Sequence, residues 1–153
     1  MMKIVLYNDS YRNQLEDLLI EFSESMYSGK CDVDVFVGYH WAVYLAVKDD
    51  IVIGFSAFSI GNYLGFLDDI VTNTYIYVKP EYRTSKAMYL FSIQAGRVSE
   101  DLDLPLEHCY ASDESKRLSR KLKGRKMYEA YIYDRDEVKR EYNRLKSKLN
   151  IKE

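Results

Sequence analysis

The sequence predicts a single α/β domain in which helices flank a mixed central sheet of about six or seven strands. Two observations carry this prediction. Three β-rich runs follow one another in the middle of the chain, and segments with helical apolar spacing lie on both sides of them. The chain has 153 residues, of which 47% are hydrophobic, so one domain with an ordinary core is expected over residues 1–153.

The chain begins with a strand-then-helix pattern. Residues 3–7 (KIVLY) form a short apolar run and are expected to be a strand. Asp9 or Ser10 can cap the helix that follows, because a side-chain oxygen there accepts from free backbone N–H groups. Residues 31–41 fit either a short helix or a loop over a pocket. The apolar positions of the first helix are Tyr11, Leu15, Leu18, Leu19, Phe22 and Met26.

Three consecutive strands are expected next. The runs at 41–47 and 51–60 are separated by the three polar residues 48–50, a spacing typical of a hairpin. A connection over 61–69 leads to a third run at 70–78, which is rich in β-branched and aromatic residues. The three strands should therefore form an antiparallel meander.

Pro80 ends this meander, because proline cannot donate a ladder hydrogen bond. We expect a helix to begin at Thr84 or Ser85, with one face formed by Ala87, Phe91, Gln94 or Ala95, Val98 and Leu102. The remaining expected elements are a strand over 106–111, a helix from Ser112 or Asp113 to Gly124, a strand over 127–133 and a C-terminal helix over about 134–149.

Composition excludes several classes of protein. The two cysteines, Cys31 and Cys109, lie far apart and form no CxxC pair, which argues against a metal site and for a reducing compartment. The apolar stretch at the N-terminus is too short for a signal peptide, and no run approaches the roughly 20 apolar residues of a membrane span. We therefore expect a cytoplasmic protein. A net charge of −2 gives no general attraction to nucleic acid.

The segment at 74–90 (TYIYVKPEYRTSKAMYL) is the most informative part of the chain. A strand runs into a proline-containing turn, and a helix follows within a few residues. Unpaired backbone N–H groups and the positive end of a helix dipole then meet at one point, which favours phosphate oxygens. Arg83 and Lys86 add two cations there. The pattern predicts a site for an anionic ligand.

The run VKPEYR at 78–83 resembles the acetyl-CoA signature V-x-P-x-[YF]-R of the GNAT-type N-acetyltransferases. The order of elements over about residues 2–133 agrees with that family. The resemblance implies a GNAT-like fold, acetyl-CoA as co-substrate, and direct transfer of an acetyl group to a primary amine of a small molecule or a protein. It also leaves open a catalytically inactive binding module of the same fold.

The resemblance places the cofactor on the end of a strand and the turn after it. The pyrophosphate would lie on backbone N–H groups of residues 83–88. The pantetheine arm would pair with residues 76–78, where that strand parts from residues 106–110, and an N–H near Val78 would polarise the thioester carbonyl. The cofactor-binding residues implied are Ile76, Tyr77, Val78, Arg83, Thr84, Ser85, Lys86, Ala87 and Met88.

The phosphate turn departs from the family pattern. Relatives carry R-x-x-G-x-G or R-x-x-G-x-A, whereas Lys86 and Met88 occupy the two small-residue positions here. A tyrosine that protonates the departing thiolate is also missing, because Arg120 stands four residues before Gly124. Tyr110 and Tyr128 are the candidate substitutes.

The general base of such a reaction is also absent from its usual strand. Thr72 and Thr74 stand about where relatives place a carboxylate, and Asp69 is the candidate base. The two histidines, His40 and His108, are expected to be structural, since a lone histidine is more often a satisfied structural residue than a base.

A basic run covers residues 116–126 and holds seven cations in eleven residues. It fits a solvated helix face, a contact with the phosphates of CoA, or a patch for nucleic acid or an acidic protein. No aromatic residue is interleaved in it, so stacking on single strands is not supported. The narrow apolar stripe of the C-terminal helix suggests either cover for its own sheet or a homodimer.

Overall fold

The computed structural model describes residues 1–26, 30–62, 69–83 and 86–108, together with Arg140, Asn143, Arg144 and Ser147. The chain divides into two units, Met1–Leu118 and Ser119–Glu153. In the second unit the four described residues are helical and exposed, and they fall inside the helix expected over 134–149. The elements expected over 112–133 lie outside the described residues.

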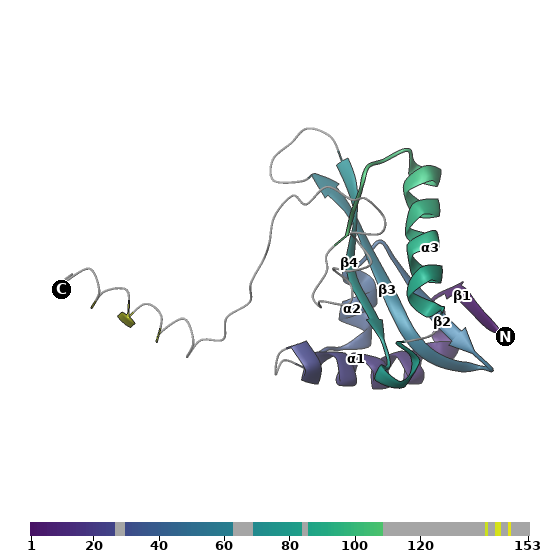
Figure 1. The fold of residues 1–153 in the computed structure, drawn as a ribbon, viewed down its shortest axis with the longest axis horizontal. Helices are drawn as coiled ribbons and strands as arrows, with labels where there is room; N and C mark the ends of the chain where they lie inside the picture. The colour runs from purple at the N-terminus through teal and green to yellow at the C-terminus, as the bar shows by residue number, and fades with distance from the viewer. Residues whose placement is uncertain are drawn as a thin grey trace. The chain divides into compact units, whose positions relative to one another are not determined.

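The first unit is built on a mixed sheet in the order β1-β2-β3-β4-β5. The first four strands pair antiparallel, and β5 runs parallel to β4 (Figure 1). The strands are β1 (Met2–Leu6), β2 (Ala42–Lys48), β3 (Ile51–Asn62), β4 (Asp69–Val78) and β5 (Leu106–His108). The mixed sheet and the meander are thus confirmed. The described residues contain five strands, fewer than the six or seven expected, and the run at 127–133 lies outside them.

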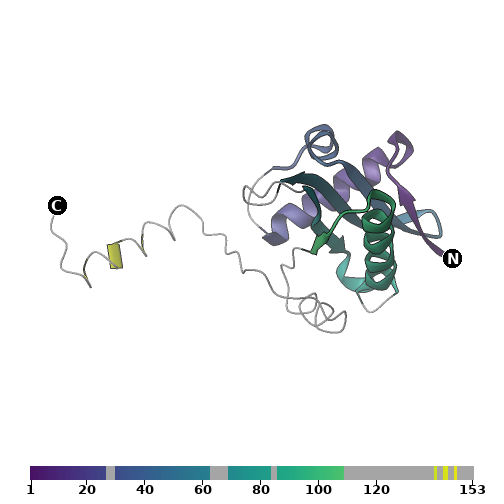
Figure 2. The same ribbon diagram turned by 90° about the horizontal axis from the view of Figure 1, so that it is seen from above.

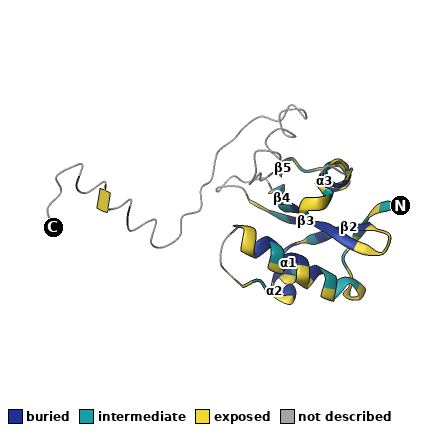
Figure 3. Cartoon of the chain, turned by 60° about the horizontal axis from the view of Figure 1, so that its bottom comes forward, coloured by how far each residue is buried: buried dark blue, intermediate teal, exposed yellow. Residues whose placement is uncertain are grey.

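Helices cover both faces of the sheet. α1 (Arg12–Met26) and α2 (Val33–Tyr39) pack on one face, and α3 (Ala87–Leu102) packs on the other (Figures 2 and 3). Two short 3-10 turns, η1 (Asp9–Tyr11) and η2 (Pro80–Tyr82), precede α1 and α3. Among the described residues, no helix is long and apolar enough to cross a membrane.

The starts of the first two helices differ in detail from expectation. Asn8 caps the first turn in place of Asp9 or Ser10, because its Oδ1 accepts from the Ser10 N–H at 3.0 Å and a 3-10 turn comes before α1. The segment at 31–41 is a short helix rather than a loop. Asp32 caps it by accepting from the Val35 N–H at 3.0 Å.

The third helix also begins later than expected, at Ala87 rather than at Thr84 or Ser85. The turn η2 accounts for the difference. Its hydrogen bonds run from the Tyr82 N–H to the Lys79 carbonyl at 2.9 Å and from the Arg83 N–H to the Pro80 carbonyl at 3.3 Å. Proline suits the first position of such a turn because its missing N–H would have no partner there.

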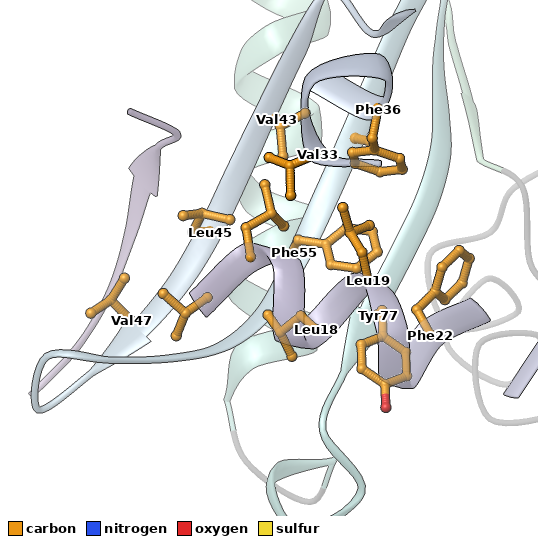
Figure 4. Close-up of a cluster of buried hydrophobic side chains, with 13 residues drawn as sticks. Leu18, Leu19, Phe22, Val33, Phe36, Val43, Leu45, Val47, Phe55 and Tyr77 are labelled. Carbon is orange, nitrogen blue, oxygen red and sulfur yellow. The ribbon is translucent and has the colours of Figure 1, made fainter. Parts of the chain in front are cut away.

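The larger core lies between the sheet and α1 and α2 (Figure 4). Phe22 is its centre on α1, with its ring centroid 5.4 Å from that of Phe55, 5.3 Å from Tyr75 and 5.7 Å from Tyr77, all in edge-to-face geometry. The hydroxyl of Tyr77 points out of the cluster. The apolar stripe predicted for α1 is confirmed, with Leu15, Leu18, Leu19 and Phe22 all buried.

Candidate functional site

Near its C-terminal end, β4 directs some of its backbone groups away from β3, toward the outer edge of the strand. The register pairs Gly54 of β3 with Val78 of β4, and the Lys79 N–H donates to the Ile53 carbonyl at 2.9 Å. These contacts make Gly54 and Val78 a non-hydrogen-bonded pair of the antiparallel ladder. Since successive residues alternate, Ile76 and Val78 direct their N–H and C=O groups away from β3.

The described part of β5 pairs with the first part of that edge. Its register on β4 runs from Val71 with Leu106 to Asn73 with His108. Within the described residues, no strand pairs with this edge of β4 beyond Asn73. Among the described residues, the N–H and C=O of Ile76 and the N–H of Val78 can pair with an extended ligand, as a further strand would, whereas the Val78 carbonyl already accepts from Arg83.

A bulge in β4 separates these two stretches. Ala57 of β3 pairs with Tyr75 and Phe58 pairs with Asn73, so Thr74 is an extra residue on β4. The side chain of Asn73 holds the bulge from inside the sheet. It is fully buried, and its Nδ2 donates to the Ser56 Oγ at 2.7 Å and to the Ala57 carbonyl at 3.2 Å.

Replacing Asn73 by alanine should lower the free energy of unfolding by about 2 kcal/mol, because it leaves buried acceptors on β3 without their donor. Chemical denaturation measures the change. Asn62→Ala, at the exposed end of β3, is the matched control and should change stability by less than about 0.5 kcal/mol. Equal losses in the two variants would contradict the role given to Asn73.

Arg83 ties the turn after β4 back to the strand. Its Nε donates to the Val78 carbonyl at 3.1 Å, and its guanidinium carbon lies 5.9 Å from the centre of the Tyr77 ring. Its own N–H donates to the Pro80 carbonyl. This N–H is one of the group at 83–88 that was expected to bind the pyrophosphate, and it is not free to do so. The residues Thr84 and Ser85 lie outside the described residues.

The N-terminal end of α3 follows this turn in the chain. The first bond into the helix runs from the Leu90 N–H to the Lys86 carbonyl at 3.0 Å, so the N–H groups of Met88 and Tyr89 have no acceptor within the helix. Lys86 is exposed. The side chain of Met88 packs against the core cluster beneath α3. The long side chain at position 88 therefore turns inward, and the helix end keeps its positive dipole.

Glu21 of α1 contacts the end of β4 on the face of the sheet that α1 and α2 cover. The Tyr77 hydroxyl donates to its Oε2 at 3.3 Å, and the Lys79 Nζ lies 3.3 Å from its Oε1. Burial, followed by the charge of Glu21, raises the pKa of Tyr77 above its ordinary value. Tyr77 thus stays a neutral donor and fixes the strand that presents Ile76 and Val78.

A carboxylate of β5 lies beside Thr72 of β4. The Thr72 Oγ1 donates to the Glu107 Oε2 at 3.1 Å, and Thr72 and Glu107 are register partners. Val71 and Leu106 pack in the cluster that contains the α3 residues Ala95 and Val98. Since side chains alternate along a strand, Thr72 and Glu107 face the side of α1 and α2.

No family model matches this chain, and no curated protein matches it. Solved structures do. The acetyltransferase of Trypanosoma brucei superposes with a TM-score of 0.69 at 12% identity, covering 88% of this chain and 99% of that one. The aminoglycoside N-acetyltransferase AAC(6')-Iy, in complex with a bisubstrate analogue of CoA, gives a TM-score of 0.68 at 18% identity, covering 88% of this chain and 98% of that one.

A third structure, the ribosomal-protein-alanine N-acetyltransferase of Brucella melitensis, gives a TM-score of 0.65 at 16% identity, covering 87% of this chain and 98% of that one. This chain has the fold of the GNAT-type acetyltransferases. The resemblance carried by the VKPEYR run is confirmed at the level of fold. At these identities the similarity shows how the chain is folded and does not identify its substrate.

Of the candidate catalytic residues named from the sequence, Asp69 is the one that lies within the described part of this GNAT fold. Asp69 is the first residue of β4; it is exposed, and its Oδ1 accepts from the Asn62 Nδ2 at 3.4 Å. Tyr110 and Tyr128 lie outside the described residues. Sequence reasoning missed Glu107, because only the parallel register of β5 on β4 places its carboxylate beside Thr72.

His40 is buried where α2 meets β2 of the GNAT fold, with 7% of its surface exposed. Its Nδ1 lies 2.7 Å from the Phe36 carbonyl, which can only accept, so Nδ1 carries the hydrogen. Burial lowers the pKa of His40 below 6.5, and the bond to Phe36 offsets part of this effect. The ring is therefore neutral at neutral pH.

This depressed pKa predicts a loss of stability in weak acid. The unfolded chain, with a histidine pKa of about 6.5, binds a proton more readily than the folded chain does. The contribution is complete above pH 6.5 and falls as the pH drops from there through the lower folded value. Thermal unfolding between pH 7.5 and 5 measures it. His40→Asn should flatten this part of the curve, and an unchanged slope would contradict the assignment.

Proposed function

We propose that this chain is an acetyl-CoA-dependent N-acetyltransferase that transfers the acetyl group directly to a primary amine of a small molecule or a protein. One observation carries the proposal. The backbone groups of Ile76 and Val78 that face away from β3 lie on the strand whose following turn leads to the N-terminus of α3. A ligand that has an extended arm joined to a diphosphate fits this arrangement, with the arm along the strand and the diphosphate at the helix N-terminus.

Acetyl-CoA would use these parts in order. Its pantetheine arm pairs with the backbone around Tyr77, between Ile76 and Val78, and a strand N–H polarises the thioester carbonyl. Its pyrophosphate lies at the start of α3, on the N–H of Met88 and beside the charge of Lys86. The other residues of this turn that we assign to the cofactor are Arg83, Thr84, Ser85 and Ala87.

The transfer needs a proton acceptor, because an amine arrives at neutral pH mainly as ammonium. Glu107 is better placed for that role than Asp69, since its register partner Thr72 lies closer along β4 to Ile76 and Val78, whereas Asp69 is the first residue of the strand. The neutral amine attacks the carbonyl carbon, the C–N bond forms and the C–S bond breaks. The amine's second proton passes to the departing thiolate, giving the amide and CoA.

Calorimetry with acetyl-CoA tests the binding step. We expect saturable binding, weaker at high salt because Lys86 acts as an exposed charge. Absence of binding at millimolar acetyl-CoA would rule out the enzyme. Lys30→Ala is the control for the charge effect. It removes an exposed cation from the segment before α2 and should leave the acetyl-CoA affinity unchanged.

The alternative is a catalytically inactive binding module of the same fold. The use of the Arg83 N–H within the turn favours it, because the phosphate cradle then offers fewer free amides. A panel of aliphatic amines, aminoglycosides and peptides, followed by release of free CoA thiol, separates the two proposals. Binding of acetyl-CoA without thiol release from any of them would select the module.

A further inference from the structure

The side of α3 that faces away from the sheet carries a stripe of exposed side chains. This outer stripe consists of Lys86, at the helix N-cap, Tyr89, Ile93, Arg97 and Glu100, all of them exposed. Tyr89 and Ile93 leave 54% and 52% of their surface in contact with solvent. Within the first unit, α1 and α2 lie on the other face of the sheet, so neither of them covers this stripe (Figures 2 and 3).

The outer stripe has the same spacing when it is followed from either end. Its members are separated by three, four, four and three residues, so the stripe is symmetric about Ile93. Lys86 and Glu100 occupy matching positions at its two ends, and their charges are opposite. Tyr89 and Arg97 occupy the matching positions next to Ile93. In a two-fold symmetric interface, residue i of one copy contacts residue j of the other and j contacts i, which is the relation that this stripe provides.

A second copy of α3, laid antiparallel on the first with the two Ile93 side chains at the axis, makes favourable contacts throughout. Lys86 meets Glu100 at both ends, each Arg97 meets the ring of a Tyr89, and the two isoleucines shield each other from water. A parallel alignment would instead place like charges together. The three ion pairs among the described residues use none of the charges of this stripe.

Gly96 agrees with a close approach to this side of the helix. Glycine inside a helix weakens it relative to alanine. A Cβ at Gly96 would meet no heavy atom within 4 Å, so packing within the described part of the chain does not require the missing side chain. In the antiparallel pair, Gly96 lies next to the Arg97 that meets Tyr89 of the other copy. The absence of a side chain there leaves room for the tyrosine ring.

We propose that the outer stripe of α3 is the contact surface of a symmetric, antiparallel homodimer, and that its occupant is the same stripe of a second copy of this chain. α3 has 16 residues, so one pair of such helices gives an interface at the small end of the range for specific contacts. The dimer is therefore weak and reversible. Its surface differs from the C-terminal helix expected over 134–149, and the inference does not depend on the proposed function.

Sedimentation equilibrium of the full chain tests this dimer. Between about 10 µM and 1 mM protein, the measured mass should rise toward twice that of one chain. Ile93→Lys should abolish the rise, because it places two ammonium groups at the axis. Ile20→Lys is the matched control. Ile20 is exposed to 49% on the helix of the opposite face, so the dimer Kd should stay within about twofold of the wild-type value.

A charge exchange tests the alignment of the two helices. Lys86→Glu alone should raise the dimer Kd about tenfold, because it turns an attraction into a repulsion at both ends of the interface. Glu100→Lys alone should do the same. The double variant, which carries both changes, exchanges the charges and should return the Kd to within about threefold of the wild-type value. The measurements are made without acetyl-CoA, because Lys86 is also assigned to the pyrophosphate.

Several results would overturn the inference. A chain that stays monomeric up to about 1 mM would do so. A dimer that Ile93→Lys leaves intact would place the contact on another surface, such as the C-terminal helix. Loss of the dimer in both single charge variants without recovery in the double variant would reject the antiparallel alignment. If circular dichroism shows that Ile93→Lys does not fold, the charge exchange decides. Failure of acetyl-CoA to bind is a separate result, which removes the proposed function and leaves the dimer standing.

Discussion

Replacing Glu107 by glutamine is expected to lower kcat for acetyl transfer by about 100-fold, the lower end of the usual contribution of a general base. Glutamine keeps the size of the side chain and an oxygen that can accept from the Thr72 hydroxyl, so the β4–β5 pair should hold. The acetyl-CoA Kd should stay the same within a factor of two. Thiol release with the best amine of the panel, followed from pH 6 to 9, measures the loss.

Asp69→Asn is the matched comparison, because it makes the same chemical change at the start of the same strand. It should alter kcat less than about twofold, since the Asp69 carboxylate is exposed and contacts the Asn62 amide. The reverse pattern, with a large loss in Asp69→Asn and none in Glu107→Gln, would return the base to the residue that the sequence favours. Equal activity in both variants would mean that neither carboxylate takes the proton.

Replacing Gly54 by alanine is expected to lower the free energy of unfolding by about 3 kcal/mol, the upper end of the usual cost of overpacking. An added Cβ would lie 2.5 Å from the Tyr77 carbonyl oxygen and 3.2 Å from the Val78 Cα. Both are backbone atoms, so β3 and β4 must move apart at this point. Because Val78 belongs to the proposed cofactor edge, acetyl-CoA affinity should fall as well. Urea unfolding and calorimetry measure the two effects.

Gly61→Ala is the control on the same strand. A Cβ there meets no heavy atom within 4 Å, and the position is exposed. Its stability should change by less than about 0.5 kcal/mol. If Gly54→Ala changed the free energy of unfolding as little as Gly61→Ala does, the fold would not depend on the close approach of β3 and β4 at Val78.

Local patterns in the sequence were sufficient to predict most of the described fold. The apolar spacing correctly predicted eight buried residues, because a helix that packs on a sheet must keep one apolar face. They are Leu15, Leu18, Leu19 and Phe22 of α1 and Ala87, Phe91, Ala95 and Val98 of α3. The β-branched run before Pro80 predicted β4, and the polar break at 48–50 predicted the β2–β3 hairpin. The VKPEYR run predicted the fold that the solved structures confirm.

The start of α3 shows where local reasoning reached its limit. A hydroxyl residue at 84 or 85 is a good helix cap, but the chain forms the 3-10 turn η2 before this point and α3 begins only at Ala87. The Arg83 side chain then bonds to the Val78 carbonyl, a partner that exists only once the turn has folded back on the strand. Competition between a turn and a helix depends on such contacts, which residue spacing does not contain.

By itself, then, the sequence determined the order of the elements, the core faces of the helices and the strand–turn–helix segment that suits a diphosphate. Those features follow from periodicity and from side-chain chemistry within a few neighbouring residues. The tertiary structure alone decided that Glu107 lies beside Thr72, that Gly54 must remain without a side chain, and that His40 keeps an unpaired Nε2 within the described residues. Each of these depends on the register between strands or on burial by residues far along the chain, because contacts at long sequence separation leave no local pattern.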